Sequence, residues 1–171
     1  VNEVFATHGK IYEATASQMF GVPVEKIVKG NPEYALRQKG KVATLALGYQ
    51  GGTSALIAMG ALNMGLTEDE LPDIVQRWRC ANPRITDLWY SVENAAVAAM
   101  QTAQPQGIRG LIFSIEGDLL YGQVFLTVTL PSGRKLYYPK PFLKENQFGK
   151  MAVHYYAVGQ QTKKWGIEST Y

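Results

Sequence analysis

The sequence predicts an α+β fold, in which a helical region over residues 1–104 precedes a β-rich region over residues 105–171. Apolar residues recur at helical spacing up to about residue 105, whereas glycines, β-branched residues and aromatic residues dominate after it. Between the two regions lies Gln104-Pro105-Gln106-Gly107, whose composition predicts a loop. A chain of 171 residues is long enough to bury a core.

Helices are expected in the first region at about residues 9–20, 32–49, 53–64, from residue 67, and at 83–103. Asn31 and Asn82 each precede a proline, and an asparagine side chain can cap a helix by accepting a hydrogen bond from a free backbone NH. Thr67 is followed three residues later by Glu70, which is the spacing of a capping box. The apolar residues expected to face inward from the last two helices are Leu71, Ile74, Val75, Trp78, Ile85, Leu88, Trp89 and Val92.

The sequence of the second region predicts β-hairpins. Strands at 111–115 and 119–121 would flank a turn at Glu116-Gly117-Asp118, and this turn is preferred over a metal site built from the two carboxylates. Strands at 124–130 and 134–138 would flank a second turn at 131–133, and residues 151–158 predict a further strand.

The composition restricts the classes of function. The net charge is only +3, with 17 lysines and arginines against 14 acidic residues, and no basic run occurs, so an anionic partner is permitted but not required. A lone cysteine, Cys80, allows neither an internal disulfide nor a cysteine-based zinc site, and His8 and His154 lie far apart in the sequence. No metal site is therefore expected. The absence of a signal peptide or membrane-spanning run predicts a cytoplasmic protein.

The predicted helix at 32–49 carries Arg37, Lys41, Leu45 and Tyr49, one every four residues, and we call these four the α-helical stripe. At 1.5 Å per residue the stripe is about 18 Å long, comparable to an extended nucleoside triphosphate. The two cations suit phosphates, and the tyrosine ring offers a flat face to a base. The same spacing also fits a solvated basic face whose tyrosine packs into the core.

Residues 37–52 resemble motif B of the family A DNA polymerases, the group that includes bacterial polymerase I. Arg37, Lys41 and Tyr49 match that motif, whereas Leu45 replaces the usual Phe or Tyr and Gln50 replaces the usual glycine. Residues 9–23 are similar to the helix that precedes motif B, with Tyr12 where the family often has a phosphate-contacting histidine. Residues 130–139 resemble a family turn rich in glycine and arginine, and residues 45–52 look most like phage or prophage members.

The resemblance implies a helical fingers module followed by β-hairpins, forming part of the fingers and palm of a DNA-directed DNA polymerase. In such an enzyme Arg37, Lys41 and Tyr12 would bind the triphosphate of the incoming deoxynucleotide, and Lys41 would also donate a proton to the departing pyrophosphate. Leu45 stands where the family's ring contacts the sugar, and Tyr49 would lie near the new base pair. The implied partners are primer-template DNA, deoxynucleoside triphosphates and the remaining palm and thumb of the polymerase.

Two aspartates hold the catalytic metal ions in this family. The resemblance implies that one precedes residue 9 and that the other lies in a His-Asp-Glu segment downstream of residue 171, and neither motif occurs in this sequence. Mg²⁺ would therefore be held by residues outside this chain. The chain, which opens at Val1, is expected to be a piece of a longer enzyme and to be inactive alone.

Further contacts with DNA are expected from polar and basic residues, namely Gln50, Arg134, Lys135, Lys163 and Lys164. The lysine pair beside Trp165 fits either a contact with the template backbone or an ordinary loop, and His154-Tyr155-Tyr156 fits either a partly buried strand or a base-stacking site. Two other classes of function stay open: a nucleic-acid-binding module without catalysis, and a scaffold domain in which Arg37 and Lys41 only solvate a helix.

Overall fold

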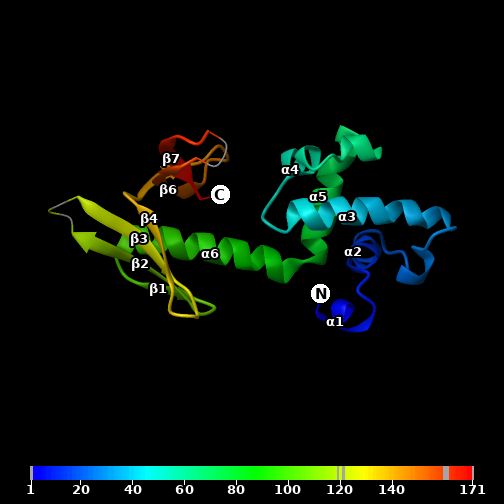
Figure 1. Ribbon diagram of the computed structural model, residues 1–171, viewed down its shortest axis with the longest axis horizontal. Coiled ribbons are helices and arrows are strands. Elements are labelled where there is room, and N and C mark those ends of the chain that lie inside the picture. Colours follow the sequence, from blue (N-terminus) through cyan, green and yellow to red (C-terminus); the bar gives the residue numbers. More distant parts are fainter. Residues whose placement is uncertain (1, 119, 121, 160–161, 171) are drawn as a thin grey trace. The chain divides into compact units, whose positions relative to one another are not determined.

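The computed structural model describes residues 2–118, 120, 122–159 and 162–170, and it confirms the α+β class (Figure 1). The chain forms two compact units, Val1–Asp87 and Leu88–Tyr171. Helix gives way to strand between Thr102 and Gln106, close to the change in composition. The units divide earlier than that, because the second half of the last helix packs on the strands. The functional division at residue 104 stays a prediction.

The first unit contains the helices α1 (Asn2–Thr7), α2 (Ile11–Phe20), α3 (Leu36–Leu47), α4 (Thr53–Ala58) and α5 (Leu71–Ala81), and α6 (Pro83–Thr102) begins in it. Short 3₁₀ turns occur at Val24–Lys26, Pro32–Ala35, Leu62–Met64 and Glu68–Glu70. The helix expected at 53–64 is interrupted because Gly60 has a φ of +83°, outside the helical region. The core of this unit includes Leu47, Leu56 and Leu71. The part of the chain that the structure describes contains no helix long and apolar enough to cross a membrane.

The expected helix caps are confirmed in one case and wrong in two. Thr67 and Glu70 form the capping box. The side-chain amide of Asn31 instead donates to the Lys26 carbonyl at 3.1 Å, and that of Asn82 donates to the Trp78 carbonyl at 2.9 Å. Both asparagines use their amide NH₂ to satisfy a preceding carbonyl, and among the described residues neither amide oxygen accepts a hydrogen bond from the helix that follows.

The described residues of the second unit form two antiparallel sheets. One has the order β1 (Gln106–Ile108), β2 (Leu111–Asp118), β3 (Gln123–Thr129) and β4 (Lys135–Pro139), and the other has β5 (Phe142–Glu145), β6 (Met151–Val158) and β7 (Trp165–Ser169). The strand expected at 151–158 is confirmed. The turn expected at residues 131–133 is also confirmed, and Leu130 N donates to Arg134 O at 2.8 Å across it.

The turn predicted at residues 116–118 is wrong, because β2 continues through it. Glu116 pairs with Phe125 and Asp118 with Gln123 in the ladder. The chain reverses only after Asp118, whose carboxylate accepts a hydrogen bond from Leu120 N at 2.8 Å. Of the predicted second strand, Leu119 and Tyr121 lie outside the described residues.

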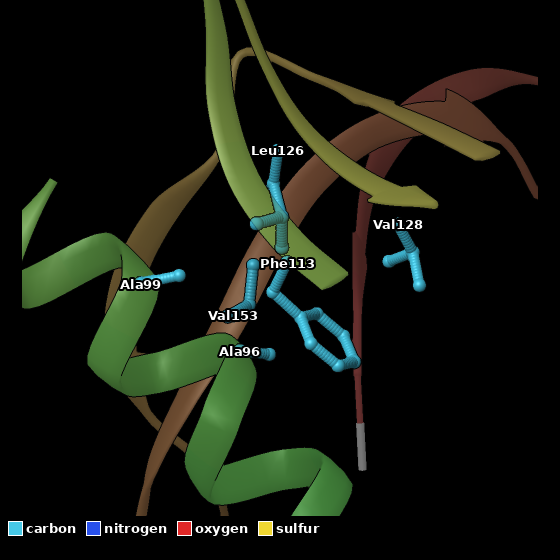
Figure 2. Packing of buried hydrophobic residues seen from close by; sticks show 6 residues of the cluster. All are labelled: Ala96, Ala99, Phe113, Leu126, Val128 and Val153. Atoms are coloured by element: carbon cyan, nitrogen blue, oxygen red, sulfur yellow. The ribbon is translucent and has the colours of Figure 1, made fainter. Parts of the chain in front are cut away.

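The core of the second unit joins α6 to both sheets (Figure 2). Ala96 and Ala99 of α6 lie against Phe113, Leu126 and Val128 of one sheet and Val153 of the other. The alanine-rich sequence thus serves close packing of a helix on strands. Trp78, Leu71, Ile74 and Val75 are buried as expected, but Leu88 is exposed, so its expected inward orientation is wrong.

Candidate functional site

Helix α3 is held against α2 at very short range. A Cβ atom added to Gly40 would lie 2.9 Å from the backbone nitrogen of Ala16 and closer still to the carbonyl oxygen of Tyr12. Next to this point Thr44 Oγ1 donates to Thr15 Oγ1 at 3.0 Å, or to its own helix at Gly40 O at 2.7 Å. The small residue therefore sets how closely the two helices approach and which α2 side chains reach α3.

Arg37 meets three side chains that surround its guanidinium group. Its Nε donates to Glu13 Oε1 at 2.8 Å, and its Cζ lies 5.3 Å from the centre of the Tyr12 ring and 6.0 Å from that of Tyr34. The hydrogen bond with Glu13 raises the pKa of Arg37, which keeps this group charged. The exposed side-chain fractions are 27% for Arg37 and 14% for Glu13, so the pair lies at the edge of the packed surface.

Lys41 lies one turn further along α3 and is half-buried. Among the described residues its ammonium group has no carboxylate within ion-pair distance and no hydrogen-bond partner. Lys39, two residues earlier on the same helix, differs in this respect, because its Nζ is 2.8 Å from Glu70 Oε1. Lys41 is therefore a cation that is available to a ligand, and Lys39 is already paired.

The two remaining stripe residues face water. Leu45 is 42% exposed and Tyr49 is 92% exposed. Because each step of four residues turns by about 40° around an α-helix, the stripe drifts from the α2 border at Arg37 toward solvent. Helix α3 ends at Leu47, two residues before the expected end, so Tyr49 lies in the following turn. The exposure of its ring excludes the alternative in which the tyrosine packs into the core.

The turn that carries Tyr49 is held by a residue that sequence reasoning missed. Arg79 of α5 donates from Nη2 to Gly51 O at 3.3 Å. Gln50 has a φ of 64°, in the left-handed region that favours glycine. Glu13 was also missed, since nothing in the local pattern of α2 indicates a partner 24 residues away. The one signal that could have identified Glu13 is its position next to Tyr12, which the family resemblance had singled out.

The chain is similar to a phage DNA polymerase. It is 55% identical over 171 residues to the protein named DNA polymerase of Bacillus phage SP02, and the match covers 99% of this chain and 25% of the phage protein. The chain thus spans about a quarter of the length of this relative. No family model matches the chain.

The other residues expected to contact DNA are placed as follows. Gln50 lies in the turn after α3, whereas Arg134, Lys135, Lys163 and Lys164 are exposed in the second unit. Lys135 is paired with a carboxylate, since its Nζ lies 2.6 Å from Glu116 Oε1. This hydrogen bond raises the pKa of Lys135 and, together with one from Thr127, lowers the pKa of Glu116. The structure thus brings Arg37 and Tyr12 together, with Lys41 a turn away, and does not test the DNA contacts.

The acidic residues of the described ranges do not gather into a group of three or more with His or Cys that could hold a metal ion. Glu116, one carboxylate of the pair considered above, accepts hydrogen bonds from Thr127 and Lys135 at 3.0 and 2.6 Å. These hydrogen bonds within the sheet already occupy the Glu116 carboxylate.

Proposed function

We propose that this chain is part of a family A DNA-directed DNA polymerase and that α3 is its motif B helix, which binds the incoming deoxynucleoside triphosphate. The observation that carries the proposal is that Arg37 and Lys41 lie one turn apart on α3, at the edge of its packed surface, in a chain 55% identical to a protein named DNA polymerase. A triphosphate needs fixed cations at its phosphates, and this surface offers one that is oriented and one that is unpaired among the described residues.

Arg37 can bind phosphate without leaving Glu13. Only its Nε is bonded to the carboxylate, and a guanidinium group carries further N–H donors in a fixed fork. Glu13 therefore holds the Nε side of Arg37 and leaves the remaining donors for a ligand, and the Tyr12 ring lies beside the guanidinium group. Lys41 supplies an ammonium group one turn away, where it would meet the charge that grows on the leaving phosphates and could return a proton to the pyrophosphate.

Leu45 and Tyr49 would act beyond the phosphates. In this proposal Leu45 contacts the sugar by shape alone, and the exposed Tyr49 ring lies near the new base pair. The left-handed φ of Gln50 explains why a glycine suits the position after the tyrosine. Mg²⁺, held by residues outside this chain, would polarise the phosphates and activate the primer hydroxyl. Primer-template DNA and the remaining palm and thumb would complete the site, so the isolated chain is expected to be inactive.

The experiment replaces the matching quarter of the Bacillus phage SP02 DNA polymerase by this chain and measures primer extension. We expect the chimera to extend a primer, and the 171-residue chain alone to give no extension. In the chimera, Lys41→Ala should lower the single-turnover efficiency of incorporation by about 10- to 150-fold, the cost of one charge-assisted hydrogen bond in kinetic terms. Both the nucleotide requirement and the maximal rate should change, because the cation meets charge in the ground state and more in the transition state.

The matched control is Lys39→Ala, which also removes a lysine side chain from α3, but one that is already paired with Glu70. An exposed pair of this kind contributes little, so its incorporation kinetics should stay within about twofold of the parent. If Lys41→Ala kept the rate and nucleotide affinity of the parent chimera, α3 would be a solvated face and the scaffold interpretation would replace this one.

A non-catalytic nucleic-acid-binding module is the second candidate, favoured by the exposed cations Arg134, Lys163 and Lys164 of the second unit. Parallel titrations of the chain with a deoxynucleoside triphosphate and with DNA separate the two functions. If the chain binds DNA but the spectroscopic signals of α3 residues show no saturable response to the nucleotide, the nucleic-acid-binding module would be favoured.

A further inference from the structure

We propose that the outer face of the β5–β6–β7 sheet binds single-stranded DNA by stacking its bases on aromatic side chains. This outer face is defined by Phe142, Lys144, His154, Tyr156, Trp165 and Ile167. It lies entirely in the second unit and is distinct from the stripe on α3. The choice of DNA over RNA rests on the proposed polymerase function, whereas the stacking argument needs only a nucleic-acid strand.

The strand register decides which side chains share this face. Val153 is fully buried in the core with α6, and Tyr155 packs edge-on against Tyr138 with ring centres 4.8 Å apart. Because successive residues of a strand point to opposite sides, His154 and Tyr156 point away from that core. Their ladder partners Phe142, for His154, and Ile167, for Tyr156, lie on the same side. Of the three residues His154-Tyr155-Tyr156, the first and last thus lie half-buried on the outer face, and the middle one packs inward.

The outer face exposes the indole ring of Trp165 and the aliphatic side chain of Ile167 to water, whereas Phe142, His154 and Tyr156 are half-buried. Trp165 is 64% exposed and Ile167 is 54% exposed. The rings of Phe142 and His154 stack with centres 5.4 Å apart and an angle of 26° between their planes. Exposed apolar side chains that lie together on one face are a feature of binding surfaces. Aromatic rings on a sheet are also a common way to bind unpaired bases, since every base has a π face.

A hollow at one end of this face adds room for a base. It has a volume of about 360 Å³, at the lower end of the range for ligand sites, and it is lined by Lys144, Phe148, His154 and Ser169 among others. From His154 to Val158, opposite Trp165, the strand runs four residues, or about 13 Å. Stacked bases of one strand are spaced by about 3.4 Å, so this length accommodates several of them.

The charges around the sheet complement a polyanion. Between residues 140 and 170 the sequence has five lysines and two glutamates. Lys140 Nζ lies 5.8 Å from the centre of the Tyr156 ring, and the exposed Lys163 and Lys164 directly precede Trp165. Cations beside aromatic rings favour a strand whose phosphates follow the lysines while its bases stack. A duplex fits this face poorly, because its base faces are already stacked inside the helix.

The test compares three ligands on the 171-residue chain by fluorescence anisotropy at low salt, without nucleotide present: a labelled twelve-residue oligothymidylate, an abasic strand of equal length, and a duplex. We expect the oligothymidylate to bind at least about fivefold more tightly than the abasic strand, which keeps the phosphates but offers no bases. Trp165→Ala should weaken oligothymidylate binding by about 5- to 150-fold, the range for losing one base–aromatic stack, and should remove most of the preference over the abasic strand. His154→Ala should act in the same direction.

The matched control is Tyr137→Ala, which removes a ring that is 57% exposed on β4, in the other sheet. This variant should bind the oligonucleotide as the parent does, and thermal unfolding should verify that each variant is folded. Equal binding of the abasic strand and the oligothymidylate, or a Trp165→Ala variant that binds like the parent, would overturn the proposal. Binding of an acidic polypeptide as tight as that of the oligothymidylate would also overturn it, because charge alone would then explain the affinity. Since no nucleotide is present and α3 is unchanged, the outcome is independent of the test with Lys41.

Discussion

Gly40→Ala is the sharpest test of how α2 and α3 build the candidate site. An added methyl group would lie 2.9 Å from Ala16 N and 3.0 Å from Ala16 Cβ, and closer still to the Tyr12 carbonyl. Ordinary van der Waals contact begins at about 3.4 Å, and two of the three obstacles are backbone atoms that cannot rotate away. The helices must therefore separate, and the separation moves Tyr12 and Glu13 relative to Arg37.

Two effects of opposite sign set the magnitude. Replacing glycine by alanine inside a helix stabilises the helix by about 1 kcal/mol. Overpacking a closely packed interface costs about 1–3 kcal/mol, and more where the obstacle is backbone. The clash at Gly40 is with backbone atoms, so its cost lies at the upper end of this range, about 2–3 kcal/mol. After the helix gain of about 1 kcal/mol, we expect the variant to be less stable by about 1–2 kcal/mol. Nucleotide binding in the chimera should also weaken, because Glu13 no longer orients Arg37.

Gly48→Ala provides the comparison. Gly48 also has helical backbone angles, φ −59° and ψ −22°, but the nearest atom to its added Cβ is Thr44 O at 3.3 Å. This variant should be neutral or slightly more stable than the parent. The assay is urea unfolding of both variants, followed by circular dichroism at 222 nm. A Gly40→Ala chain as stable as Gly48→Ala would refute the close approach of α2 and α3.

Two further predictions concern carboxylates around α3. Glu13→Gln keeps an oxygen that accepts a hydrogen bond from Arg37 Nε but removes a negative charge near the phosphates, so the nucleotide affinity of the chimera should rise by about two- to fivefold. Glu13→Ala should lose this gain, because Arg37 is no longer held. Equal nucleotide affinities of the two variants would contradict the orienting role of Glu13. The hydrogen bond from Lys39, together with hydrogen bonds from Thr67 and the charge of Lys39, lowers the pKa of Glu70 from 4.5 to about 2. A lowered pKa means that this contribution to stability is complete above about pH 4.5 and disappears as the pH falls toward 2. Glu70→Gln should therefore show a smaller loss of urea midpoint than the parent between these pH values, and parallel curves would argue against the pair.

The elements that the sequence predicts well are those whose periodicity and local chemistry agree. Helix α5 is one example, since Leu71 and Trp78 follow the helical period and the Thr67–Glu70 box marks its approach. Strand β6 is another, predicted with its observed bounds. In both, the information lies within a few residues of the element, so tertiary contacts do not change the outcome.

The predictions that fail depend on partners far away in the sequence. Gly117 suggested a turn, but the strand opposite extends the ladder through it. Asn31 and Asn82 suggested caps, but each amide donates to a carbonyl that precedes it, and spacing cannot distinguish the two uses of an amide. The same limit applies to the candidate site, where Arg37 was found from its spacing but Glu13 was not.

The contacts of Arg37 and Lys41 assign different tasks to two cations that the sequence treats alike. Glu13 offsets the charge of Arg37, so the Arg37–Glu13 pair is oriented but has no net charge when a triphosphate approaches. Lys41 has no such partner among the described residues, and its long-range attraction is not cancelled. Lys41 should therefore govern how fast an anion is captured, and Arg37 how precisely it is held once the free N–H donors of its fork contact the phosphate oxygens. A site with two unpaired cations would bind any polyanion. An oriented Arg37 guanidinium beside the unpaired Lys41 ammonium instead favours a ligand whose phosphates are spaced like these two groups along α3.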